Sequence, residues 1–216
     1  MTVKTQRRQR RTQERTELTR QKLLSAAVSE FSSRGFDGVT SRDIEIAADV
    51  QRGLLKYHFG DKDSMWRAAA DELFHLRIDE INQQKQLAQD LSDREQLALR
   101  IRAFVRFSAE HPELNRMMVQ EGKRHSWRTD YIIENYISKT AAGLKDLTQA
   151  NLPIDDEIFV HWYYFYIGAG AFAFSVSPEA KRLFGTDVSS KAFIDRHAEL
   201  LVEFLMNHFE TFAKGN

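Results

Sequence analysis

Cysteine is absent from this chain of 216 residues, and proline occurs only three times. Without cysteine the protein can form no disulfide bond and offers no thiolate as a nucleophile or a metal ligand. No apolar run approaches the roughly 20 residues that a membrane-spanning helix requires, and the N-terminus lacks the apolar core of a signal peptide. We therefore expect a cytoplasmic protein with no membrane partner.

Motifs typical of enzymes are also missing. The sequence has no glycine-rich phosphate loop, no nucleophile elbow and no paired-histidine metal motif. Its seven histidines are scattered, and His58 lacks the second histidine three or four positions away that zinc hydrolases need. We predict no catalytic residue, no metal site and no cofactor. An enzyme or a small-molecule carrier is the least favoured class.

Helical periodicity recurs along the chain, and 42% of its residues are hydrophobic, enough for buried cores. The length accommodates one small domain and one larger domain. With so few prolines, these features predict an all-α protein. We expect a flexible basic tail over residues 1–15, a small helical domain over 16–62, a connecting helix over 63–89 and a larger helical domain over 90–216.

The net charge is zero, but the charges are unevenly distributed. Residues 1–60 carry 12 basic and 7 acidic side chains, whereas the remaining residues carry 19 basic and 24 acidic ones. A basic first third is typical of a domain that binds a polyanion. The tail is either a solvated flank or an arm that follows phosphates or enters the minor groove. Its first eleven residues contain no acid and five basic residues, Lys4, Arg7, Arg8, Arg10 and Arg11.

The segment from Thr40 to Lys62 reads as two short helices joined by a tight turn, followed by an aromatic-His-aromatic triplet and a lysine. Thr40 can cap a helix that starts near Ser41. The turn falls at residues 48–50, because Asp49 tolerates a left-handed backbone better than most residues. This pattern predicts a helix-turn-helix, and therefore DNA binding. Apolar residues of the second helix anchor it on the core and leave an outward face made of Gln51, Arg52, Gly53 and Lys56.

DNA contacts divide into phosphate contacts, which position a protein, and base contacts, which carry sequence information. The predicted phosphate donors are Thr40, Ser41, Tyr57, His58 and Lys62. The predicted base readers are Arg42, Gln51, Arg52 and Lys56, and Gly53 lets the backbone approach closely. Each of them could instead be an ordinary solvated side chain, and we assign Phe59 to the core.

The run VTSRDIEIAADVQRGLLKYHFGDKDSMWRAA resembles the DNA-binding signature of the TetR family of transcriptional regulators. The likeness extends back to residues 19–36 and so covers about the first third of the chain. The resemblance supports the phosphate-contact roles and implies a homodimer with a ligand pocket in its second domain. Three positions depart from the usual pattern: Asp49 replaces a common turn glycine, Glu45 a common small residue and Lys56 a frequent second aromatic.

Two C-terminal segments are candidates for the homodimer interface. The helix expected around residues 157–176 is apolar nearly all round, so it should be buried on both sides. The last helix, expected over residues 190–213, repeats apolar residues at helical spacing. One side of each helix should face its own domain and another a second copy of the chain.

Aromatic residues in the second domain either form a dense core or line a cavity for a small ligand. The residues that could line it are Phe104, Phe107, Met118, Trp127, Tyr131 and Phe165. Arg106, Arg124 and His125 could pair with an acidic group on the ligand, although a solvated face is the simpler interpretation.

Together these observations predict a dimeric regulator, a repressor in our expectation, whose two reading helices enter successive major grooves about 34–36 Å apart on a near-palindromic operator. A small effector in the second domain would release it from double-stranded DNA. The alternative is a DNA-binding protein whose second domain only dimerises or recruits a protein partner. An enclosed cavity in that domain, or its absence, discriminates between the two.

Overall fold

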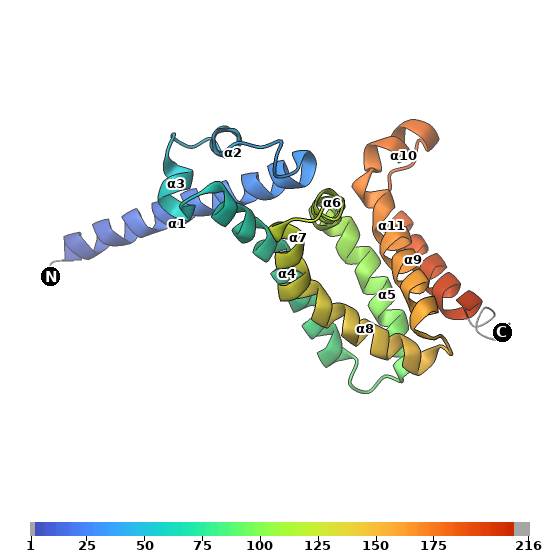
Figure 1. Cartoon of the computed structure of the whole chain (residues 1–216). Coiled ribbons are helices and arrows are strands. Elements are labelled where there is room, and N and C mark those ends of the chain that lie inside the picture. The colour runs from blue at the N-terminus through green and yellow to red at the C-terminus, as the bar shows by residue number, and fades with distance from the viewer. Residues whose placement is uncertain (1–2, 210–216) are drawn as a thin grey trace. The chain divides into compact units, whose positions relative to one another are not determined.

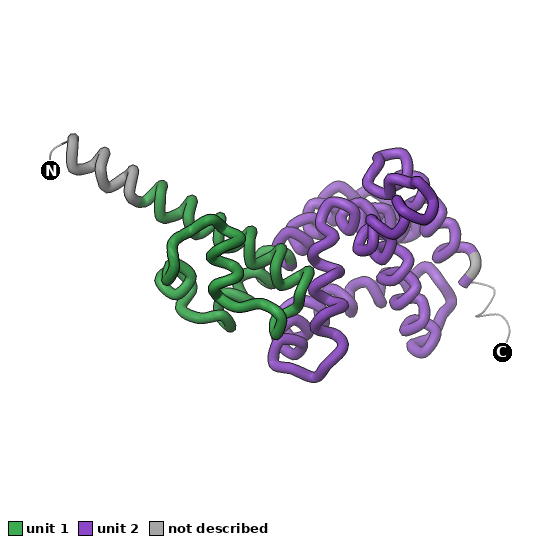
Figure 2. Tube along the Cα trace, turned by 90° about the horizontal axis from the view of Figure 1, so that it is seen from above, with its two compact units in different colours: residues 1–73 green, residues 74–216 purple. Residues whose placement is uncertain are grey.

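The computed structural model describes residues 3–209, apart from the side chains of residues 3–12 and of His208. The described residues form helices and no strand, which confirms the all-α prediction. Figure 1 follows these helices along the chain. The chain divides into two compact units, residues 1–73 and residues 74–216, which Figure 2 distinguishes by colour.

Unit 1 consists of α1 (Val3–Arg34), α2 (Ser41–Ala47), α3 (Leu54–Phe59) and the first half of α4 (Lys62–Leu87). Gly35 ends α1 with a φ of 70°, because glycine adopts this left-handed backbone without steric cost. The core of the unit consists of fully buried apolar side chains from all four helices, among them Leu23, Phe31, Ile44, Leu55 and Trp66.

Helix α1 begins at Val3, whereas we expected a flexible tail through residue 15. Residues 3–15 contain no glycine or proline and are rich in arginine and glutamine, which favour helices. The side chains of Lys4, Arg7, Arg8, Arg10 and Arg11 lie outside the described residues. A DNA contact by this arm therefore stays a prediction.

The division between the units falls inside α4, between Leu73 and Phe74. We expected the whole of residues 63–89 to act as a connector and the second domain to begin near residue 90. The second half of α4 instead packs as part of unit 2, where the ring of Phe74 stacks on Tyr136 with the centroids 4.7 Å apart.

Unit 2 is built around α5 (Asp93–Glu110), which packs against α6 (Pro112–Glu121), α8 (Ser138–Asn151), α9 (Asp156–Ser175) and α11 (Lys191–Glu203) (Figure 1). The remaining elements are α7 (Trp127–Ile132), α10 (Ser177–Phe184) and two π-helical segments, η1 (Ile133–Ile137) and η2 (Phe204–His208). No helix in the described part of the chain is long and apolar enough to cross a membrane.

Side-chain caps fix where the helices of unit 2 begin. Ser92 and Glu95 form a capping box at α5, and the Asp155 carboxylate accepts from the Ile158 amide at α9. Such caps satisfy amides that have no partner inside the helix.

The core of unit 2 lies where α5, α9 and α11 meet. The ring of Phe104 stacks on Tyr166 with the centroids 4.4 Å apart, and the fully buried Trp162 donates its indole N–H to the Leu205 carbonyl at 3.1 Å. Gly170 of α9 allows this packing, since a Cβ there would lie 2.7 Å from the Phe104 ring and 3.3 Å from Leu201.

Gly170→Ala should therefore destabilise unit 2, because the added methyl displaces a stacked ring. Overpacking costs about 1–3 kcal/mol, against a gain of about 1 kcal/mol in helix propensity. Gly143→Ala is the matched control, since Gly143 lies within α8 and a Cβ added there would have nothing within 4 Å. We expect the free energy of unfolding, measured by urea titration, to rise for Gly143→Ala and to be at least about 1 kcal/mol lower for Gly170→Ala than for Gly143→Ala. Equal values would contradict the packing argument.

Candidate nucleic-acid interface

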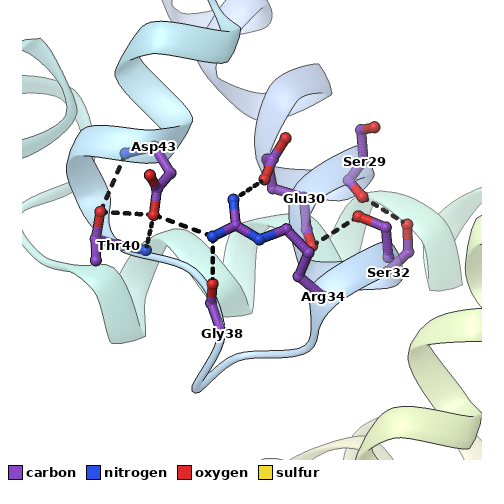
Figure 3. A network of polar contacts seen from close by, with 8 residues as sticks. Ser29, Glu30, Ser32, Arg34, Gly38, Thr40 and Asp43 are labelled. Carbon is purple, nitrogen blue, oxygen red and sulfur yellow. Dashed lines mark hydrogen bonds and ion pairs between the residues drawn. The ribbon is translucent and has the colours of Figure 1, made fainter.

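The start of α2 is held in place by Arg34, at the end of α1 (Figure 3). Its guanidinium donates to the Glu30 carboxylate at 2.8 Å and to the Gly38 carbonyl at 2.6 Å, and lies 3.5 Å from the Asp43 carboxylate. One side chain thus ties the last turn of α1, the α1–α2 loop and the first turn of α2 together. The position of Thr40 follows from these contacts.

Thr40 and Asp43 form a capping box at the N-terminus of α2. The Thr40 hydroxyl accepts from the Asp43 amide at 3.1 Å, while the Asp43 carboxylate accepts from the Thr40 amide at 2.8 Å. The hydrogen bond from the Thr40 amide is the main cause that lowers the pKa of Asp43, with its hydroxyl and Arg34 adding to it. The capping role predicted for Thr40 is confirmed.

The turn between α2 and α3 contains two residues with positive φ, Asp49 at 51° and Gly53 at 90°. Asp49 therefore occupies the left-handed region, as the sequence predicted. Helix α3 begins later than we expected: Leu54 is its first residue, and Gln51 and Arg52 belong to the turn. The left-handed backbone at Gly53 causes this difference, because it cannot continue into a right-handed helix.

Gly53 has no side chain to cap α3, and Glu45 of α2 supplies the missing acceptor. One oxygen of its carboxylate accepts from the Gly53 amide at 2.6 Å and from the Leu55 amide at 3.2 Å. The other oxygen lies 3.6 Å from the guanidinium of Arg42. Glu45 is only 4% exposed, so this carboxylate joins α2 to the first turn of α3 from inside the unit.

The ten predicted DNA-contact residues lie along α2, the turn and α3, and at the first residue of α4. Three of them, Ser41, His58 and Lys62, are half-buried. The exposed ones are Thr40, Arg42, Gln51, Arg52, Gly53, Lys56 and Tyr57.

Tyr57 is 75% exposed, and its ring meets His58 edge-on with the centroids 5.0 Å apart. Lys62 differs from the others because its ammonium lies 3.9 Å from the centre of the Phe36 ring. This cation–π contact gives Lys62 a packing role in addition to any phosphate contact. Phe59, which we assigned to the core, is half-buried.

A second candidate site is a partly enclosed cavity of about 150 Å³ within unit 2. Phe104, Phe107 and Met118 line it, as the sequence suggested. The other three predicted residues do not line it, for reasons of position. Phe165 is half exposed and packs on Phe204 and Phe209, Trp127 lies at the start of α7 beside Arg128, and Tyr131 contacts the cavity residue Tyr136 from outside.

The polar residues of this cavity also differ from those we considered. Arg106 is exposed and pairs with Asp195, and Arg124 and His125 are exposed as well. The cavity is lined instead by Arg77 of α4 and Arg100 of α5. Within the described residues, no group of three or more histidine, aspartate or glutamate side chains is arranged to hold a metal ion.

Replacing Glu45 tests its role as the cap of α3. In Glu45→Ala the Leu55 amide stays buried without its acceptor, which costs about 1–3 kcal/mol. We expect faster hydrogen–deuterium exchange of the amides in residues 53–57 and weaker binding of any duplex that the protein recognises. Glu45→Gln keeps an acceptor oxygen, so its amide exchange should rise less and its affinity for the duplex should fall less than in Glu45→Ala.

Glu17→Ala is the control for the loss of one negative charge from unit 1, since Glu17 is an exposed residue of α1. It should change the exchange of residues 53–57 little. If Glu45→Ala behaves like Glu17→Ala, the carboxylate does not hold the start of α3.

Comparisons with known proteins agree with this geometry. Residues 23–75 match the model of a family described as bacterial regulatory proteins, tetR family. The chain is 31% identical over 58 residues to the biofilm operon icaADBC HTH-type negative transcriptional regulator IcaR of Staphylococcus epidermidis, covering 27% of this chain and 31% of that protein. It is 30% identical over 105 residues to the HTH-type transcriptional repressor NicS of Pseudomonas putida, covering 48% of each.

The chain thus matches about a third of the length of IcaR and about half of NicS. Among solved structures, a TetR-like transcriptional regulator from Rhodococcus sp. RHA1 superimposes with a TM-score of 0.63 at 18% identity, covering 87% of this chain and 93% of that one. This likeness shows that the fold extends through both units. The N-terminal segment of the chain thus matches the tetR family of bacterial regulatory proteins, and the fold of the chain is that of a TetR-like regulator.

Proposed function

We propose that this protein is a sequence-specific transcriptional regulator that represses as a homodimer and is released from DNA by a small molecule. The observation that carries the proposal is the surface formed by α2, the turn and α3. Its exposed side chains are cationic or hydrogen-bonding, and the core fixes the backbone beneath them through Ile44 and Leu55.

This surface has the chemistry that both parts of DNA recognition require. Arg52 and Lys56 can bind the edge of guanine and Gln51 the edge of adenine. Thr40 and Tyr57 can donate to phosphates on either side of the reading helix. Because each copy of the chain offers one such surface, two copies are needed to read a palindromic site.

A stripe of exposed residues on α9 supports the homodimer. We expected this helix to be buried on both sides, and one side does lie in the core of unit 2, through Phe159, Trp162 and Tyr166. The opposite side is exposed in the single chain, and its exposed residues recur at intervals of three and four positions. The stripe consists of Glu157, Val160, His161, Tyr164, Phe165, Gly168, Ala169 and Phe172.

Such spacing puts one continuous seam on a helix, which is typical of a helix that packs on another. Leu200 and Phe204, from α11 and η2, add further exposed apolar surface. Contiguous apolar surface of this kind marks an interaction site. We take these helices as the faces by which two copies associate; residues 210–213, also part of the interface expected from the sequence, lie outside the described residues.

The cavity of unit 2 favours release by a ligand over the alternative of a second domain that only dimerises. Helix α4 runs without a break from Lys62, a predicted phosphate contact, to residues of the cavity lining such as Arg77. An effector that binds better when α4 is displaced would reduce the population competent to bind DNA.

Selection from a pool of random duplexes tests the proposed function, followed by titration of the selected duplex at two salt concentrations. We expect an enriched near-palindrome whose affinity falls steeply with salt, because phosphate contacts release counterions. No enrichment over random DNA at either salt concentration would refute sequence-specific binding.

Two substitutions distinguish the predicted base readers from the predicted phosphate donors. Arg52→Ala should cost about 1–3 kcal/mol on the selected duplex and relax the preference at one base pair, with little loss on random DNA. Tyr57→Phe removes only a phosphate donor and should weaken all duplexes alike. Fluorescence anisotropy with both duplexes measures each loss, and equal losses for Arg52→Ala would remove Arg52 from the base readers.

The dimer face is tested with two valines of matched exposure, Val160 in the α9 stripe at 51% and Val119 in α6 at 49%. Val160→Asp would bury two unpaired charges in a symmetric dimer, which costs several kcal/mol, and should yield a monomer. Val119→Asp should leave the protein dimeric. Sedimentation velocity separates these outcomes, and a dimeric Val160→Asp protein would place the interface elsewhere.

A further inference from the structure

The cavity of unit 2 has the size of a single small ring. Its volume of about 150 Å³ matches cavities in protein cores that bind benzene. All of its lining residues belong to unit 2: they come from α4, α5, α6, η1, α8 and α9, with His111 between α5 and α6.

Flat aromatic surfaces form much of the cavity wall. Phe74 and Tyr136 lie nearly parallel, at 8°, with the centroids 4.7 Å apart, and Phe104 stacks on Tyr166. Tyr136 belongs to the π-helical segment η1, which shifts the register of side chains between α7 and α8. Aromatic walls favour a ligand that itself presents a flat ring.

Two guanidinium groups line the same apolar cavity. Arg77, whose side chain is 11% exposed, is paired with Glu80 and donates to the Tyr166 hydroxyl at 3.3 Å, and its guanidinium lies 5.2 Å from the centres of the Phe104 and Phe107 rings. Arg77 is therefore compensated by groups of the protein itself.

Arg100 is not compensated in this way. Across the described side chains, it has no hydrogen bond and no ion pair within 4 Å, and the two groups that favour its charge at longer range, Tyr166 and Glu80, are shared with Arg77. Burial lowers its pKa, but a guanidinium keeps its charge inside proteins. The cavity lining contains these two guanidinium groups and no carboxylate, since Glu80 lies outside it, so the charged groups that line the cavity are positive.

Tyr166 offers a neutral donor beside these cations. Burial raises the pKa of Tyr166 to about 12, so its hydroxyl stays protonated. Because the oxygen of this hydroxyl already accepts from Arg77, its own proton is available to a ligand oxygen.

We propose that the effector is a single-ring aromatic carboxylate, with its ring against the aromatic wall and its carboxylate on Arg100 and the Tyr166 hydroxyl. A carboxylate pairs well with a guanidinium and would balance positive charge at the cavity, whereas a cationic ligand would meet two like charges. This inference rests on the proposed function only in treating the cavity as the effector site.

The ligand class is tested by calorimetric titration of the full chain without DNA, using benzoate as the probe at constant ionic strength. Benzamide has the same ring without the charge, and hexanoate has the charge without the ring. We expect benzoate to bind at least tenfold more tightly than either, because a hydrogen bond to a charged group is worth about one to two powers of ten in affinity. Equal affinity for benzamide overturns the role of the charge, and equal affinity for hexanoate overturns the role of the ring.

Two substitutions locate the carboxylate. Arg100→Gln should weaken benzoate binding at least tenfold, and Arg100→Lys should restore part of it while the circular dichroism of both stays native. Arg106→Gln is the matched control on the same helix, since Arg106 lies at the surface. The affinity of this variant for benzoate should be unchanged. Unchanged affinity in a folded Arg100→Gln protein would overturn the site.

The readout involves no DNA, so it is independent of the regulator hypothesis. Binding of benzoate without release of a selected duplex would leave the ligand class intact and refute the switch. Failure of benzoate to bind a protein that still selects an operator would refute the ligand class alone.

Discussion

The surface formed by α2, the turn and α3 depends on the hydrogen bonds that the Glu45 carboxylate accepts. Helix α3 has six residues, and an isolated helix of that length is not stable in water. Its N-terminus carries glycine where other helices of this chain carry Thr, Ser or Asp. The acceptor must then come from elsewhere, and a buried residue of α2 provides it at 2.6 and 3.2 Å.

This arrangement lets the turn keep Gly53 in the left-handed conformation. A side-chain cap at that position would need an extended backbone, which is the usual conformation of a capping residue. By placing the acceptor on α2, the chain satisfies the amides of α3 while Gln51 and Arg52 remain outside the helix. The same carboxylate also lies beside the guanidinium of Arg42, a predicted base reader. One side chain therefore contacts both Arg42 and the first turn of α3.

Local signals in the sequence were enough to predict much of the fold. The boundaries set by Thr40, Ser92 and Gly35 could be read because each depends on neighbours within a few positions. The start of α1 was misjudged because charge suggested a solvated tail, whereas helix propensity and the absence of glycine and proline favour a helix. The segments η1 and η2 leave no comparable local signal.

The functional sites also differ in whether neighbouring residues in the sequence or distant ones form them. The ten predicted DNA-contact residues belong to one contiguous motif, so the sequence alone indicated that they lie on neighbouring elements of unit 1. The role of Glu45 could not be predicted, since it reaches residues eight and ten positions away, and only its departure from the family pattern marked it. Arg77 and Arg100 lie 23 positions apart on different helices, and only tertiary packing brings them to one cavity.

The placement of these arginines bears on how a ligand could act at a distance. A ligand shifts an equilibrium only by the difference between its affinities for the two states. A ligand that contacted α5 and α9 alone could bind tightly without favouring either state of the reading surface. Arg77 and Phe74 belong to α4, the one helix that also begins at the reading surface, and Arg77 is joined to Tyr166 of the proposed carboxylate site. In the proposed switch, a change in that hydrogen bond would act on α4, and α4 would link occupation of the cavity to DNA affinity.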